Sequence, residues 1–154
     1  MMRYELKGFT ARAKARPISG KGRMFVPRPY QEWKACVREA LATSYAPVPT
    51  LSQVAIAIEI HSPTRPRGDL DNLAGGLLDA IQPPRAKGDV RAQRQLEAEA
   101  SIEERMQAAP GSLIGDDRQV VALSIRWIRS KRRMIVLMVE EQADMADVSK
   151  GSAR

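Results

Sequence analysis

The chain has 154 residues, of which 44% are hydrophobic, and this suits one domain with an apolar core. Its 25 Lys and Arg against 18 Asp and Glu leave a formal net charge of +7, which favours an acidic polymer as the partner. A single cysteine, Cys36, excludes an intramolecular disulfide, and the lack of a long apolar run excludes a membrane span, so we expect a soluble cytoplasmic protein.

The N-terminal segment is strongly basic. Loose alternation over residues 3–16 predicts a strand, and a Gly-containing turn at 16–26 leads into a short second strand. Residues 1–34 contain nine Lys or Arg and two acids, which makes this segment the leading candidate for phosphate contacts. A solvated arm is the alternative interpretation.

Three regular elements follow. Apolar residues recur at helical spacing over residues 27–46, which predicts a helix with Pro29 in its first turn. Alternating Val and Ile predict a strand over 51–61 with one buried face, and an apolar run predicts a second helix over 70–82.

Residues 83–113 are expected to lie outside the compact core. A charged helical stretch over 89–108 carries only isolated apolar residues, which leaves a thin apolar stripe. We therefore expect an inserted, largely exposed helix within residues 83–112.

The C-terminal part predicts a hairpin. Strands are expected over 119–128 and 134–140, joined by a basic turn at 129–133. These elements complete a single domain over 1–140, and residues 141–154 are expected to form a flexible tail.

Two acidic stretches stand at the starts of apolar elements. Gly68-Asp69-Leu70-Asp71-Asn72-Leu73 opens the second helix, and Gly115-Asp116-Asp117 opens the strand at 119–128. Side chains at such positions lie at the rim of a packed body, where they can converge without burial. Clustered carboxylates raise one another's pKa unless a cation joins them. Oxygen ligands that face a polyanion favour Mg²⁺, with Mn²⁺ as a substitute.

Each acid also has an ordinary structural interpretation. Asp and Asn before an apolar run are common helix caps, and Asp-Asp before a strand is a common turn. A calcium loop is excluded, because Leu73, Ala74 and Ala80 stand where it needs a ligand, a glycine and a glutamate. His61 is the only histidine, and a lone histidine is usually structural.

Several motifs together resemble the RusA family of Holliday-junction resolvases. They are Asp69-Leu-Asp-Asn-Leu, Leu78-Asp79-Ala80, Asp116-Asp117-Arg-Gln-Val-Val, and Gly22-Arg23 followed by Phe25-Val26. The similarity covers roughly residues 3–82 and 113–140.

This resemblance implies a fold, an activity and a site. The fold is α+β, a small mixed β-sheet with two main helices packed on it, to which this chain adds its inserted charged helix. The activity is that of a homodimeric, Mg²⁺-dependent endonuclease that cuts four-way DNA junctions in recombination and repair. Genes of this family often travel with phages, so the cell is a bacterium or a phage-infected host. By position, the catalytic residues are Asp69, Asp71 and Asp117, and Asp116 joins them as a metal ligand.

One position departs from the family pattern. The family usually places a lysine one turn after the Asp-Leu-Asp-Asn motif, where it helps to stabilise charge at the scissile phosphate, and this chain has Gly75 there. Lys21, Arg23, Arg67 and Arg118 are candidate substitutes, among which the sequence does not choose. The departure leaves open a junction-binding protein that cuts poorly. A third hypothesis is a basic RNA-binding protein in which the acidic residues serve only as helix caps and turns.

Adjacent glycines in mid-helix, Gly75-Gly76, cost about 1 kcal/mol each relative to alanine. Close approach of another backbone, or of DNA, would explain them, and so would drift. The basic residues predicted to contact DNA flank the acidic motifs or lie in the two basic turns: Lys14, Arg16, Lys21, Arg23, Arg65, Arg67, Arg118, Lys131 and Arg132.

Overall fold

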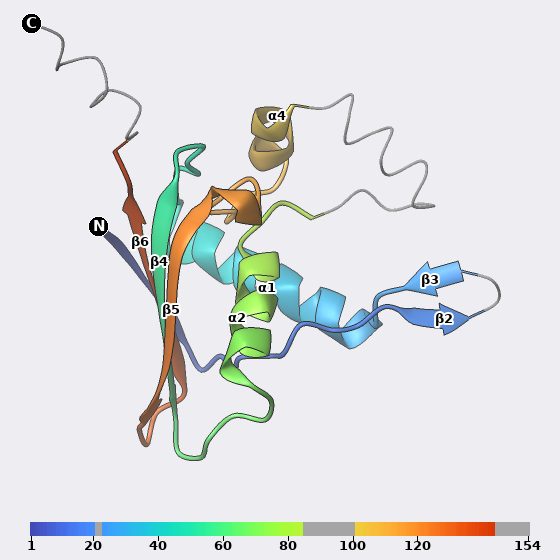
Figure 1. Cartoon of the computed structure of the whole chain (residues 1–154), viewed down its shortest axis with the longest axis vertical. Coiled ribbons are helices and arrows are strands. Elements are labelled where there is room, and N and C mark those ends of the chain that lie inside the picture. Colours follow the sequence, from blue (N-terminus) through green and yellow to red (C-terminus); the bar gives the residue numbers. More distant parts are fainter. Residues whose placement is uncertain (21–22, 85–100, 144–154) are drawn as a thin grey trace, which may run out of the picture.

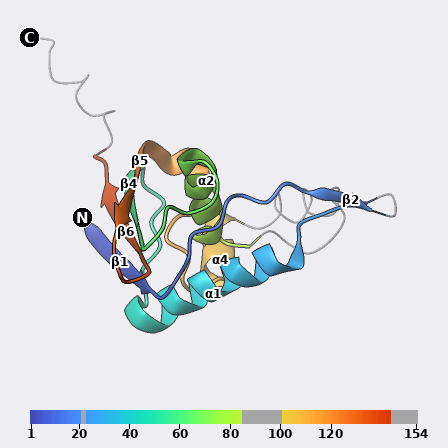
Figure 2. The same ribbon diagram turned by 90° about the horizontal axis from the view of Figure 1, so that it is seen from below.

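A four-stranded mixed sheet forms one layer of the molecule, and the helices lie against one of its faces (Figures 1 and 2). The computed structural model describes residues 1–20, 23–84 and 101–143. Neighbouring strands pair antiparallel except for β4 and β5, which are parallel. The strand order is β1 (Met2–Lys7), β6 (Met134–Glu141), β4 (Val54–Ser62), β5 (Val120–Arg129). This confirms the predicted α+β fold.

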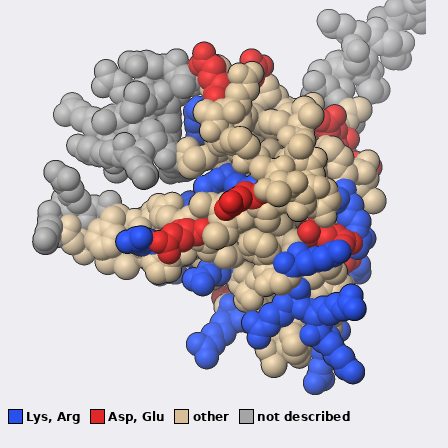
Figure 3. All heavy atoms as spheres, turned by 180° about the vertical axis from the view of Figure 1, so that it is seen from behind, with Lys and Arg blue, Asp and Glu red and all other residues tan. Residues whose placement is uncertain are grey.

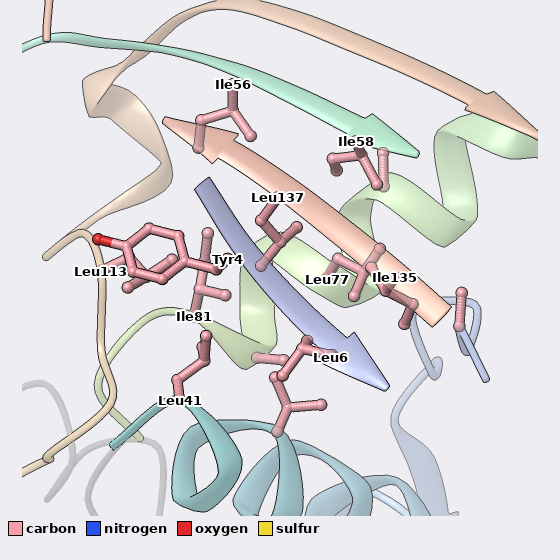
Figure 4. Close-up of a cluster of buried hydrophobic side chains, with 14 of the residues drawn as sticks. Tyr4, Leu6, Leu41, Ile56, Ile58, Leu77, Ile81, Leu113, Ile135 and Leu137 are labelled. Atoms are coloured by element: carbon pink, nitrogen blue, oxygen red, sulfur yellow. The ribbon is translucent and has the colours of Figure 1, made fainter. Parts of the chain in front are cut away.

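The central strand β4 determines how the core is built. Its parallel partner β5 requires a crossover connection, and that connection contains the helix α2 (Leu70–Ala80). Alternate residues of β4, from Val54 to Ile60, are at most 2% exposed and face the helices. The close-up in Figure 4 shows Ile56 and Ile58 of this strand together with Leu77 of α2.

The helix α1 (Arg28–Tyr45) covers the same face of the sheet as α2. Both helices confirm the elements predicted over 27–46 and 70–82. A proline in the first turn of α1 suits a position whose N–H has no helical partner. Trp33, Val37 and Leu41 are buried beneath this helix, as their spacing indicates.

Strand β1 is shorter than the stretch that predicted it. The chain leaves the sheet after Lys7, and residues 8–17 cross the helices, where the Lys14 N–H donates to the Asn72 carbonyl at 3.0 Å. The Trp33 Nε1–H donates to the Thr10 carbonyl at 3.1 Å. Polar groups of this segment are therefore satisfied by the helices instead of a strand partner. A separate hairpin of β2 (Ile18–Gly20) and β3 (Arg23–Phe25) follows.

The prediction that residues 83–113 stay out of the core is wrong for Pro83 and for several of the residues from Met106 to Leu113, which are buried. A short helix α4 (Ile102–Gln107) is followed by a return to the core, where Ser112 is 1% exposed and Leu113 is 2% exposed. The Leu113 N–H donates to the Ile81 carbonyl at 2.8 Å, just beyond the end of α2. Sparse apolar spacing over 89–108 does not reveal this return. Residues 85–100 of the predicted insertion and 144–154 of the predicted tail lie outside the described residues.

The other face of the sheet carries a charged cluster that we term the Glu59 group: Glu59, Arg126 and His61. Glu59 is 7% exposed, and its carboxylate accepts hydrogen bonds from Arg126 and pairs with His61 Nε2 at 3.1 Å. These bonds, chiefly the one from Arg126, hold the pKa of Glu59 below its ordinary value. The lone histidine therefore has a structural partner on the face opposite the helices.

Among the described residues, no helix is both long and apolar enough to cross a membrane.

Candidate functional site

Asp69 and Asp71 stand where α2 begins. Gly68 has a left-handed φ of +97°, which turns the chain into the helix, and Asp69 occupies the N-cap position. The Asp69 side chain nevertheless makes no capping hydrogen bond. Both carboxylates are exposed. Helix capping therefore does not account for the acid at position 69, and its carboxylate can bind another group.

Asp116 and Asp117 stand at the start of a short 3-10 turn, η1 (Asp117–Gln119), that leads into β5. Asp116 caps this turn, because its Oδ1 accepts from the Arg118 N–H at 2.8 Å. The Gln119 side chain accepts from the Gly115 and Asp116 N–H groups and donates to the carbonyls of residues 50 and 52. The turn is thereby held against the start of β4. Asp116 thus has a structural role in a turn, which is the ordinary interpretation of Asp-Asp before a strand, whereas Asp117 is exposed beside it.

The neighbouring carboxylates of Asp116 and Asp117 shift each other's pKa values. A hydrogen bond from the Arg118 N–H lowers the pKa of Asp116. The pKa of Asp117 is raised, first by its hydrogen bond with Asp116, then by partial burial and by the charge of Asp116. Lys14 acts against this rise, and Asp79 adds to it. A cation bound at the pair would relieve the repulsion.

Lys14 and Tyr30 both reach Asp79, on the second turn of α2 after Asp71. Lys14 Nζ lies 3.1 Å from Asp79 Oδ1, and the Tyr30 hydroxyl donates to Asp79 Oδ2 at 3.0 Å. Burial and the neighbouring carboxylate raise the pKa of Tyr30. We term Lys14, Asp79, Asp116 and Asp117 the Asp117 group. Asp79 was not predicted as a site residue, although its spacing of eight residues from Asp71 places both on one helix face.

The predicted carboxylates lie toward the two ends of α2. Asp71 and Asp79 are separated by about 12 Å along the helix axis, and Asp117 interacts with Asp79. Within residues 1–20, 23–84 and 101–143, no group of three or more His, Cys, Asp or Glu could hold a metal ion. The predicted four-carboxylate cluster is therefore not preformed in the described residues.

This arrangement still fits Mg²⁺ by the chemistry of its donors. Mg²⁺ usually keeps several waters and binds through one or two carboxylates together with substrate phosphates, so a closed protein cage is not required. Asp117 is exposed and Asp116 is half-buried, and a cation bound to this pair would relieve the repulsion between the two carboxylates. Metal ligation by Asp69, Asp71, Asp116 and Asp117 stays a prediction.

Basic residues gather around the start of α2. The loop before Asp69 carries exposed Arg65 and Arg67, and the Ser130 N–H of the β5–β6 turn donates to the Ser62 carbonyl at 3.0 Å. The predicted Lys131 and Arg132 are exposed on this turn. Figure 3 shows Lys and Arg side chains gathering at this lower end of the molecule. DNA could thus approach the helix start across a basic surface.

The other predicted DNA contacts are scattered. Arg16 is exposed on the segment that crosses α2, and the Arg118 side chain is 90% exposed, 3.9 Å from Asp116. Lys21 lies outside the described residues, as does the side chain of Arg23. Lys14 is the one of these predicted DNA contacts that belongs to the Asp117 group.

Residues 9–105 match the protein-family model described as endodeoxyribonuclease RusA. The matched segment is well over half of the chain, and it contains Lys14, Asp69, Asp71 and Asp79. The acid pair of the η1 turn lies beyond it, so that pair is placed beside the matched helix by the fold. No curated protein matches the chain.

Proposed function

Because this chain belongs to the RusA endodeoxyribonuclease family, we propose that it is a Mg²⁺-dependent endonuclease that cuts four-way DNA junctions by phosphodiester hydrolysis. One observation carries the proposal. Asp117, from outside the matched segment, lies beside the helix that presents the matched acids, and its raised pKa marks an excess of negative charge. Carboxylates with that excess suit a site where a cation meets a phosphate, and the basic surface at the start of α2 offers contacts to further phosphates.

The residues have distinct roles in this proposal. Asp69, Asp71 and Asp117 are the catalytic carboxylates that would hold Mg²⁺, and Mn²⁺ would substitute for it. Asp116 would add a ligand oxygen, and as the cap of η1 it also positions Asp117. When bound, the metal ion supplies charge neutralisation at the phosphate and lowers the pKa of a water.

In this proposal, the basic residues at the start of α2 bind the duplex arms of the junction. Arg65, Arg67, Lys131 and Arg132 are exposed and lie on two loops joined by the hydrogen bond between Ser130 and Ser62. Their charges would contact phosphates without reading sequence. We also propose a homodimer, because a twofold-symmetric enzyme matches the paired strands of a junction with two sites.

A cleavage assay on a mobile four-way junction tests this function. We expect cleavage with Mg²⁺ or Mn²⁺ and none with EDTA, and weaker cleavage of a linear duplex of the same sequence. Cleavage in EDTA would contradict the proposed metal requirement. Junction binding without cleavage under any metal would instead identify an accessory protein, and preference for RNA would identify an RNA-binding protein.

Asp71→Asn is the matched variant for this assay. It removes a proposed ligand charge and keeps the size of the side chain, so cleavage should be lost. Junction binding should survive or tighten, because repulsion between this carboxylate and phosphate is removed. Cleavage at the wild-type rate would show that Asp71 is not part of the site.

A further inference from the structure

The place of the missing family lysine is occupied by a lysine from another segment. A Cβ atom added at Gly75 would lie 3.5 Å from Lys14 Cδ and 3.6 Å from Lys14 Cβ. The aliphatic part of Lys14 therefore passes over the helix at position 75. Lys14 precedes this position by 61 residues in the sequence, and it was not among the substitutes that the sequence suggested.

Backbone contacts hold Lys14 in this position. Its N–H donates to the Asn72 carbonyl at 3.0 Å. A Cβ atom at Gly76 would lie 2.0 Å from the Arg12 carbonyl oxygen and 3.2 Å from Lys14 N, so only glycine lets the segment approach this closely. The two adjacent glycines thus have separate explanations. Gly76 admits the backbone of the crossing segment, and Gly75 leaves room for the Lys14 side chain.

The ammonium group of Lys14 is directed into the acidic site. Its Nζ lies 3.1 Å from Asp79 Oδ1, and its charge also acts on Asp117. The side chain is 51% exposed, so it stays accessible to a DNA phosphate. Arg118, one of the substitutes considered from sequence, is 90% exposed.

We propose that Lys14 supplies the ammonium group that the family pattern places at position 75, and that it contacts the scissile phosphate. This inference rests on the proposed nuclease function. In the free protein Asp79 holds the ammonium group beside the carboxylates. When DNA binds, the same group would face the charge that develops on the phosphate oxygens.

The test removes the charge and then restores it from the helix. Lys14→Met keeps the side-chain stem over Gly75, and single-turnover junction cleavage should fall by about 10²–10³-fold. Gly75→Lys in that background should recover at least about tenfold, because position 75 lies four residues from both Asp71 and Asp79 on one helix face. Gly75→Lys alone should give no gain, since it brings a second ammonium group to an occupied place.

Two further arms separate catalysis from damage to the fold. Arg3→Ala removes one positive charge from β1, where Arg3 pairs with Glu5, and should leave the rate unchanged. Mn²⁺ binding without DNA, measured by calorimetry, should be unchanged or tighter in Lys14→Met, because a cation that repels the metal is gone. If the role of Lys14 were purely structural, Lys14→Met would weaken both Mn²⁺ binding and junction cleavage.

Two results would overturn the assignment of Lys14. One is cleavage by Lys14→Met at the wild-type rate. The other is failure of Gly75→Lys to recover activity in a double variant whose melting temperature matches that of Lys14→Met. If the wild-type protein itself leaves junctions uncut, the proposed function fails first and the role of Lys14 fails with it.

Discussion

The Glu59 group and the Asp117 group both bring carboxylates to cations, and they differ in charge balance. In the Glu59 group, one carboxylate accepts hydrogen bonds from an arginine and pairs with a histidine, and its pKa is lowered. In the Asp117 group, Lys14 pairs with Asp79, and the exposed Arg118 side chain lies 3.9 Å from Asp116. The pKa of Asp117 is nevertheless raised, because its first neighbour is another acid. A perturbed pKa alone does not identify an active site, since structural ion pairs also perturb pKa values.

The direction of the shift separates the two groups. Glu59 already accepts hydrogen bonds from the Arg126 guanidinium and pairs with His61, so this arrangement stabilises the fold without a further ligand. The Asp117 group keeps a charge excess that a metal ion would remove. We therefore assign a structural role to the Glu59 group and propose that the nuclease site comprises the Asp117 group together with Asp69 and Asp71.

The largest expected difference between the groups is catalytic. Asp117→Asn should lower single-turnover junction cleavage by at least about a hundredfold, the scale of losing one preorganised group at a reacting phosphate. Glu59→Gln, which also replaces one carboxylate by an amide, should leave the rate within about twofold and cost about 1 kcal/mol of stability. Equal loss of cleavage in both variants would remove the distinction.

The free energy of unfolding should fall when Gly76 is replaced, because this glycine lets the segment that carries Lys14 pack closely on α2. Gly76→Ala would place a methyl group against the Arg12 carbonyl, and forced displacement in a packed site costs about 1–3 kcal/mol. Gly75→Ala is the control, since its Cβ meets Lys14 at ordinary contact distance and should gain up to about 1 kcal/mol in the helix. Urea unfolding of both variants measures this. A Gly76→Ala protein as stable as wild type would mean that the crossing segment is loosely held.

Salt dependence should separate paired from available cations. Replacing Lys131 and Arg132 by alanine should flatten the plot of log K for junction binding against log salt by up to about 1.8, at about 0.9 per phosphate contact. Arg126→Ala should leave the slope unchanged, because Arg126 pairs with Glu59 on the other face of the sheet. A slope that changes only with Arg126 would move the DNA surface to that face.

The smallest expected effect is on stability as a function of pH, in EDTA. The folded-state pKa of Glu59 lies below its unfolded value of about 4.5, so its contribution is full above that pH and is lost as the pH falls through the folded pKa. Asp117 has the opposite sign, because its raised pKa costs stability at neutral pH and acid relieves that cost. As the pH falls below about 4.5, the free energy of unfolding of Glu59→Gln should therefore decrease by about 1 kcal/mol less than that of the wild type, and that of Asp117→Asn should decrease slightly more than that of the wild type. Parallel curves for the three proteins would contradict these assignments.

Local periodicity was enough to predict α1, α2 and the strands β4, β5 and β6. Trp33, Val37 and Leu41 recur at helical spacing, and the alternation of β4 marks its buried face, because both patterns depend only on neighbours in sequence. The acids were predictable as residues at element starts. That Asp116 caps its turn while Asp69 does not cap its helix depends on side-chain orientation, which sequence spacing does not contain.

Contacts between distant segments could not be predicted. The placement of Lys14 over Gly75 depends on how residues 8–17 cross α2, and no pattern within either segment encodes that contact. The same holds for Leu113, whose burial follows from a return to the end of α2 after a charged stretch. A glycine pair in mid-helix was the one available signal, and its cause became clear only from the neighbouring backbone.

Metal binding to the free protein tests most directly whether the charge-unbalanced group is the site. Mn²⁺ affinity can be measured by calorimetry on the wild type, Asp117→Asn and Glu59→Gln under one buffer condition. We predict that Asp117→Asn weakens Mn²⁺ binding by at least about tenfold, which corresponds to about 1.4 kcal/mol, and that Glu59→Gln binds as the wild type does. Unchanged binding in Asp117→Asn, or loss of binding in Glu59→Gln, would contradict the assignment.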